Sequence, residues 1–176
     1  MGSWEFLLIF ILVLIGAGVT NLLHGIGRLM LQRSSIRFWW VHAVWLTVLA
    51  FTHVTVWFSF YGQQGRAYGF WEFAGFFFSF GLLQLLTVLT FPDASTPAPL
   101  DLREHFLAHH RPYFGIWVLV WLTLLLQQGA ATGRHALWPA VYAALSVVGV
   151  VVSSARWHAC LAAAILAAIA VHVSVG

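Results

Sequence analysis

Histidines inside apolar stretches are the residues of this chain whose types and spacing could do chemistry. The chain has nine histidines, with His42 and His53 in one apolar stretch and His158 and His172 in another. The first two are 11 positions apart and the second two 14, which corresponds to about 16 and 21 Å along a helix, on nearly one face. Each stretch therefore offers one titratable ring near each side of a membrane, where such groups are usually functional.

A pathway for protons or small cations is the first chemistry that this pattern predicts, because a conduit needs polar or titratable sites at two depths. Gly16, Thr20, His24 and Arg28 recur at steps of four, on one helical stripe. Glu72 stands just inside the third apolar stretch, where a buried carboxylate would need a histidine partner. The predicted pathway comprises Thr20, Asn21, His24, Arg28, His53, Glu72 and His172, with His53 and His172 as the partners expected for Glu72. The alternatives are a packing seam of small and polar residues and a Glu72 that is solvated at the interface.

Electron transfer through b-type haem is the second chemistry that the histidines could support. Two haems stacked across a bilayer need four axial histidines at two depths, and His42 with His158 and His53 with His172 supply that number. In this respect the chain is similar to the multi-span b-type cytochromes of the ferric-reductase and cytochrome b classes. It departs from them because their histidines are more widely spaced on each helix, and because Trp45 is bulky where haem needs a small residue.

A divalent metal ion is a third candidate ligand, because His105 and His109 are one helical turn apart. The segment from His105 to His110 is similar to one histidine box of membrane di-iron desaturases and hydroxylases, but those enzymes need several boxes and no second one is found. The other interpretation of the pair is a surface position beside Arg111, facing lipid headgroups. The single cysteine, Cys160, excludes a multi-cysteine metal site. No nucleophile–base pair or phosphate loop is recognisable, so the sequence leans against an enzyme.

The composition determines which elements must position these residues. The chain has 176 residues, of which 61% are hydrophobic and only 7% charged, with a mean hydropathy of +0.89. This excludes a soluble enzyme, a disordered chain and a nucleic-acid-binding module. We predict one all-α domain, a polytopic bundle of six transmembrane helices in the lipid bilayer with a short interfacial helix. The expected spans are about 6–30, 38–61, 68–91, 113–128, 137–152 and 157–175, with a proline-rich loop over 92–100 and the interfacial helix over 101–111.

The ends of the interfacial helix and the orientation follow from individual residues. Asp101 is expected to cap that helix with help from Glu104, and Pro112 to end it. Six arginines fall in or beside the first, third and fifth connections, against two in the second and fourth. The positive-inside rule then puts the odd-numbered connections in the cytoplasm and both termini on the outer side.

Two stretches also carry a resemblance to a known group. Glu5-Phe-Leu through Gly16-x-Gly-x-Thr20-x-x-x-His24-Gly, and Phe91-Pro-Asp through Asp101-Leu-Arg-x-His-Phe106, resemble a group of small six-span bacterial membrane proteins of uncharacterised activity. The resemblance implies a multi-pass protein of the bacterial inner membrane. Small residues in the first and last spans favour a homo-oligomer or a partner in a membrane complex.

Proton or small-cation conduction is the function that the sequence favours. A b-type haem protein and a non-catalytic accessory or structural subunit remain the alternatives.

Overall fold

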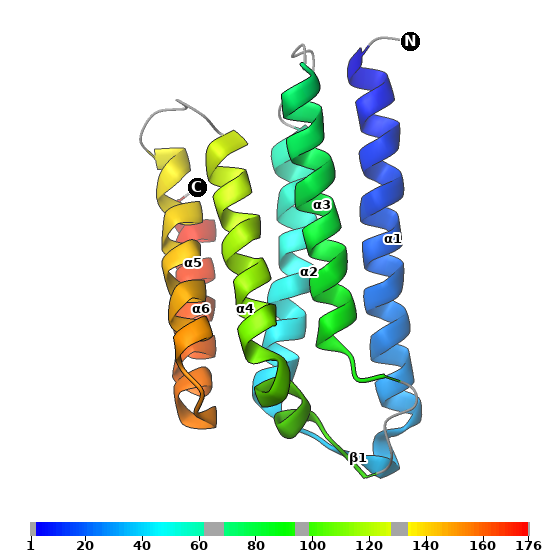
Figure 1. The fold of residues 1–176 in the computed structure, drawn as a ribbon, viewed down its shortest axis with the longest axis vertical. Coiled ribbons are helices and arrows are strands. Elements are labelled where there is room, and N and C mark those ends of the chain that lie inside the picture. The colour runs from blue at the N-terminus through cyan, green and yellow to red at the C-terminus, as the bar shows by residue number, and fades with distance from the viewer. Residues whose placement is uncertain (1–2, 62–68, 94–98, 128–133, 176) are drawn as a thin grey trace.

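The computed structural model describes residues 3–61, 69–93, 99–127 and 134–175, which are almost entirely helical. Its six long helices lie side by side, with α1–α3 forming one half of the bundle and α4–α6 the other (Figure 1). The helices are α1 (Ser3–Leu31), α2 (Trp40–Tyr61), α3 (Phe70–Thr90), α4 (Leu102–Gln127), α5 (Arg134–Val151) and α6 (Ala155–Val175). The predicted all-α fold is confirmed, and the ends of α2, α3 and α6 lie within two residues of the predicted spans.

Four of these helices are long and apolar enough to cross a membrane. Their apolar segments are Glu5–Leu31, Trp40–Trp57, Phe70–Thr90 and Ala155–Ser174, in α1, α2, α3 and α6. Helix α5 carries a shorter apolar stretch, Leu137–Val151. The structure therefore supports a membrane protein with four candidate spans among its described residues.

Helix α4 differs from the sequence prediction. The expected interfacial helix over 101–111 and the expected span over 113–128 form one continuous helix, with Pro112 in its interior. A proline inside a helix removes one backbone hydrogen bond and costs ~3 kcal/mol. Here Phe106 before the proline and Phe114 after it are both buried in the same core, and their packing favours the unbroken helix. The chain still changes direction in the lower part of α4 (Figure 1).

The beginning of α4 follows the prediction. One carboxylate oxygen of Asp101 accepts hydrogen bonds from the backbone N–H groups of Arg103 (2.9 Å) and Glu104 (3.2 Å). These N–H groups have no partner inside the helix, so the Asp101 side chain acts as the N-cap.

Two short strands connect the halves of the bundle at one end. The 3-10 turn η1 (Arg33–Ser35) follows α1 and leads into β1 (Ile36–Arg37), which pairs in parallel with β2 (Leu100–Asp101). The guanidinium of Arg37 also lies 4.0 Å from the carboxylate of Asp101. The connection between α1 and α2 is thereby joined to the start of α4.

Aromatic rings fill the core between α2, α4 and α6. Trp45 and Phe114 are in edge-to-face contact with ring centroids 4.9 Å apart, and Phe106 lies against both. Helix α5 comes close to this core at Gly149, where an added Cβ would lie 2.5 Å from Cγ of Phe114. Only a glycine at this position allows α5 to approach α4 without displacing that ring.

Candidate functional site

The C-terminal end of α3 binds side chains from three other helices. The Nη2 of Arg28 (α1) donates to the carbonyl oxygen of Pro92 at 2.6 Å, and the Nε2 of His42 (α2) donates to that of Thr90 at 2.8 Å. The Nε2 of His105 (α4) lies 3.3 Å from the carbonyl oxygen of Leu89. We call Arg28, His42 and His105 the α3 cap.

The last carbonyl groups of a helix have no partner within it, which explains this convergence. They also form the negative end of the helix dipole, where positive charge is stabilised. In membrane proteins such carbonyl ends can coordinate a cation or proton, although their commonest role is to accept capping side chains. The α3 cap fits either role.

His105 lies in the part of α4 that precedes Pro112, outside the spans predicted from the sequence. Burial, followed by the nearby His109 ring, lowers the pKa of His105 from 6.5 to about 4, and its bond to Leu89 opposes that shift only in part. At neutral pH this member of the cap is therefore an uncharged hydrogen-bond donor.

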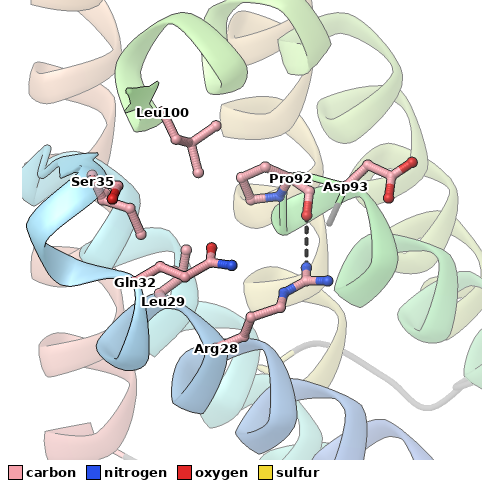
Figure 2. A pocket seen from close by; sticks show the side chains of 8 residues that line it. Arg28, Leu29, Gln32, Ser35, Pro92, Asp93 and Leu100 are labelled. Atoms are coloured by element: carbon pink, nitrogen blue, oxygen red, sulfur yellow. Dashed lines mark hydrogen bonds between the residues drawn. The ribbon is translucent and has the colours of Figure 1, made fainter. Parts of the chain in front are cut away.

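A cavity of about 140 Å³ opens beside the α3 cap. Arg28 lines it from α1, Gln32 from the turn just after α1, Pro92 and Asp93 from the segment that follows α3, and Leu100 from β2. Figure 2 shows the guanidinium of Arg28 on its wall, bonded to Pro92, with the Gln32 amide directed into the same space. The volume is enough for a few water molecules at about 30 Å³ each, and the walls supply polar partners for them.

A second polar group lies deeper in the bundle, where α1, α2 and α3 meet. His53 is 2% exposed, and its Nδ1 donates to the carbonyl oxygen of Leu49 at 2.8 Å, which leaves Nε2 as the nitrogen with the lone pair. A Cβ on Gly18 would lie 2.6 Å from that Nε2 and 3.1 Å from Nε2 of Gln84. The His53 ring and the Gln84 amide thus occupy the space that Gly18 leaves free.

Gln84 connects this group to α1. Its Nε2 donates to the carbonyl oxygen of Leu14 at 2.9 Å, and its Oε1 accepts from Nδ2 of Asn21 at 3.3 Å. We call Asn21, His53 and Gln84 the mid-span group. Two residues of these sites were not predicted from the sequence: Gln84, and Thr90, whose carbonyl oxygen bonds to His42. A glutamine inside an apolar run is a sign of a buried polar contact and could have identified Gln84.

The other members of the predicted pathway lie elsewhere. Thr20 and His24 are exposed on the outer face of α1. The carboxylate of Glu72 accepts the backbone N–H of Gly69 at 2.9 Å at the start of α3, about 18 Å along the helix from Gln84. His172 contacts Tyr142 through a 3.1 Å hydrogen bond and stacks on Trp138. Of the predicted pathway, Asn21, Arg28 and His53 therefore each contact a neighbouring element of the α1–α3 half. The expected pairs of Glu72 with His53 or His172 are not formed.

The four histidines considered for haem all have other neighbours. His42 and His53 bond to backbone carbonyls, as described above, and the ring of His158 stacks on Phe114 with centroids 5.3 Å apart. Axial ligation by His42 with His158, or by His53 with His172, would require these rings to leave their present partners.

The two histidines predicted to bind a metal ion lie close together, but one ring nitrogen of each already faces a backbone carbonyl oxygen. The rings of His105 and His109 have centroids 4.7 Å apart, while Nε2 of His105 faces Leu89 and Nδ1 of His109 faces the His105 carbonyl oxygen. Within the described residues, no three His, Cys, Asp or Glu side chains are grouped closely enough to hold a metal ion.

Comparison of the chain with protein-family models, with curated proteins and with solved structures finds no match.

Proposed function

We propose that this chain is a six-span membrane protein that conducts or transports protons or small cations between α1, α2 and α3. The observation that carries the proposal is His53, an ionisable side chain buried halfway along an apolar helix, with the amide of Gln84 beside it in the space that Gly18 leaves free. The Gln84 amide in turn accepts a bond from the exposed Asn21. Ionisable groups at this depth are costly and commonly mark ion or proton pathways.

The path would run from the mid-span group to the α3 cap and the cavity beside it. His42 lies about 16 Å from His53 along α2, and Thr90 about 9 Å from Gln84 along α3. Thr87 stands between these two positions on α3, buried, with a hydroxyl that donates to the Leu83 carbonyl oxygen and can still accept a bond. Polar groups therefore recur at short steps from the middle of the bundle to a water-sized cavity at its end.

The six-span topology is part of the same proposal. In it, the apolar part of α4 beyond Pro112 and the apolar stretch of α5 also cross the bilayer of a bacterial inner membrane, with both termini outside. A Cys160→Ser variant that carries one new cysteine at residue 2 or at residue 65 tests it. Residue 2 should react with an impermeant maleimide in intact cells, and so should residue 65, whereas a cysteine at Arg33 should not.

Conduction is tested in proteoliposomes loaded with a pH-sensitive dye, with an imposed potential driving uptake. Wild-type protein should acidify the interior faster than empty vesicles, and His53→Ala should return the rate to that of empty vesicles. His53→Gln keeps a polar side chain but removes the titratable ring. Loss of proton flux in this variant would show that conduction requires a side chain at position 53 that takes up and releases protons, and not only one that is polar. His172→Ala, in the other half, is the matched control and should retain flux.

Unchanged flux in His53→Ala would overturn the proposed path. Well-folded wild-type protein that passes neither protons, sodium nor potassium would refute conduction altogether and would leave the accessory or structural subunit as the better account.

A further inference from the structure

Several buried polar atoms gather between α4 and α6, away from the mid-span group. His158 is 0% exposed and His110 is 7% exposed, and their rings are in contact with centroids 5.3 Å apart at an interplanar angle of 68°. Among the described residues, the Nε2 of His110 has no hydrogen-bond partner, and neither ring nitrogen of His158 has one of ordinary geometry, although the backbone carbonyl of Val152 lies near one of them. Buried polar atoms without a partner are costly, so their gathering in one contact needs an explanation.

The hydrogen bond on the other side of His110 determines which nitrogen is available. Its Nδ1 lies 2.6 Å from the carbonyl oxygen of Leu107 and must be the protonated nitrogen, because a carbonyl can only accept. The Nε2 therefore carries the lone pair. A histidine that donates one N–H to a backbone carbonyl and presents the other nitrogen is the usual arrangement of a metal ligand.

We propose that His110 and His158 bind a single Cu⁺ ion between α4 and α6. At a metal–nitrogen distance of about 2 Å, two imidazoles that share one ion have centroids roughly 5 Å apart in a bent arrangement and roughly 6 Å apart in the linear arrangement that Cu⁺ favours with two ligands. The two rings, with centroids 5.3 Å apart, are therefore close enough to share an ion and would separate by about 1 Å for linear coordination. Imidazole is a good ligand for copper and zinc. The site is distinct from the predicted pair, because it uses His110 of α4 and His158 of α6 in place of His105 and His109.

The surroundings favour an ion of single charge. The ring of His158 is held by Phe114, stacked at 5.3 Å, and by Phe106, edge-on at 5.3 Å. These walls are uncharged, and Arg111 and Arg156, the nearest charged residues in sequence, are exposed. A divalent ion with two neutral ligands would keep its full double charge in this apolar setting, whereas a monovalent ion has a much smaller desolvation penalty and can also be stabilised by aromatic faces.

Competition between the purified full-length protein and a chromogenic Cu⁺ chelator, under anaerobic reducing conditions, measures the site directly. Wild-type protein should withdraw one equivalent of Cu⁺. His158→Phe should abolish this binding while keeping the ring that packs on Phe114, and His110→Leu should abolish it as well. His109→Ala is the matched control, because His109 is next in sequence to His110 and exposed, and it should bind like wild type.

Three results would overturn the proposal: no binding by folded wild-type protein, undiminished binding in His158→Phe and His110→Leu, or an equal loss in His109→Ala. Far-UV circular dichroism of each variant establishes that it is folded. Because the readout is metal binding, it is independent of the flux measured for His53 variants, and either proposal can fail without the other.

Discussion

The close approach of α5 to α4 at Gly149 allows a stability change to be worked out in advance for Gly149→Ala. The new methyl group would lie 2.5 Å from Cδ1 and Cγ of Phe114, whose side chain is 0% exposed. Carbon atoms in contact prefer about 3.5–4.0 Å, so the ring or the helix must move by roughly 1 Å. The ring has little room to do so, because Trp45 and His158 pack against it with centroids 4.9 and 5.3 Å away.

Two terms of opposite sign decide the size of the effect. Overpacking a filled core costs about 1–3 kcal/mol, while replacing glycine by alanine inside a helix recovers about 0.5–1 kcal/mol. We therefore expect Gly149→Ala to lower the free energy of unfolding by about 0–2.5 kcal/mol, with a middle value near ~1 kcal/mol. Gly115→Ala on α4 is the matched control, since an added Cβ there meets nothing within 4 Å, and its stability should be unchanged or rise by up to about 1 kcal/mol.

Unfolding in mixed micelles of increasing SDS content, followed by circular dichroism, measures both variants. A double-mutant cycle with Phe114→Leu tests the mechanism, because a smaller side chain should relieve the overlap and give a coupling energy of at least about 0.5 kcal/mol. The reasoning is refuted if Gly149→Ala is as stable as Gly115→Ala, or if its effect is the same with Phe114 and with leucine.

Three further outcomes can be checked by similar means. Pro112→Ala should raise the free energy of unfolding by up to ~3 kcal/mol, because it restores a backbone hydrogen bond in a helix that is already continuous; a decrease in the SDS titration would mean that the proline bend is needed for packing. Asp101→Ala should lower it by about 0.5–2 kcal/mol through loss of the N-cap, whereas Arg37→Ala should change it by less than about 1 kcal/mol because that ion pair is largely exposed. The His105 ring should titrate near pH 4 by NMR, below its ordinary pKa of 6.5. Between these two values the unfolded chain binds the proton and the folded chain does not, so the free energy of unfolding should be highest above pH 6.5 and should decline as the pH falls toward 4. A titration near pH 6.5 would contradict the burial of this ring.

The helices and their ends could be predicted because hydropathy and capping act locally. Long apolar runs predict α1, α2, α3 and α6. The position of Asp101 just before a helical segment predicts an N-cap, and its side chain does cap α4. The continuity of α4 through Pro112 could not be predicted in the same way. The local cost of the proline is outweighed there by the packing of Phe106 and Phe114 against a core made by other helices.

The partners of the polar side chains were less accessible than the helices. The spacing of the histidines predicts how far along a helix each ring lies and on which side of that helix it stands. It does not predict which neighbouring helix each ring contacts. His53 meets Gln84 and Gly18 rather than Glu72, and His158 meets His110, because the order of helix packing determines these contacts. An aromatic stripe at Phe106, His110, Phe114 and Trp117 becomes visible in the sequence only once the helix is read through Pro112.

The pairing of β1 with β2 has a consequence for the biogenesis of this protein. Ile36 pairs with Leu100, so the first strand leaves the ribosome well before its partner exists. At about 5–20 residues per second, the backbone groups of the first strand wait several seconds for the second. During that interval α2 and α3 are synthesised. The arrival of residues 100–101 then joins the connection between α1 and α2 to the start of α4, so this pairing can form before α4, α5 and α6 are complete.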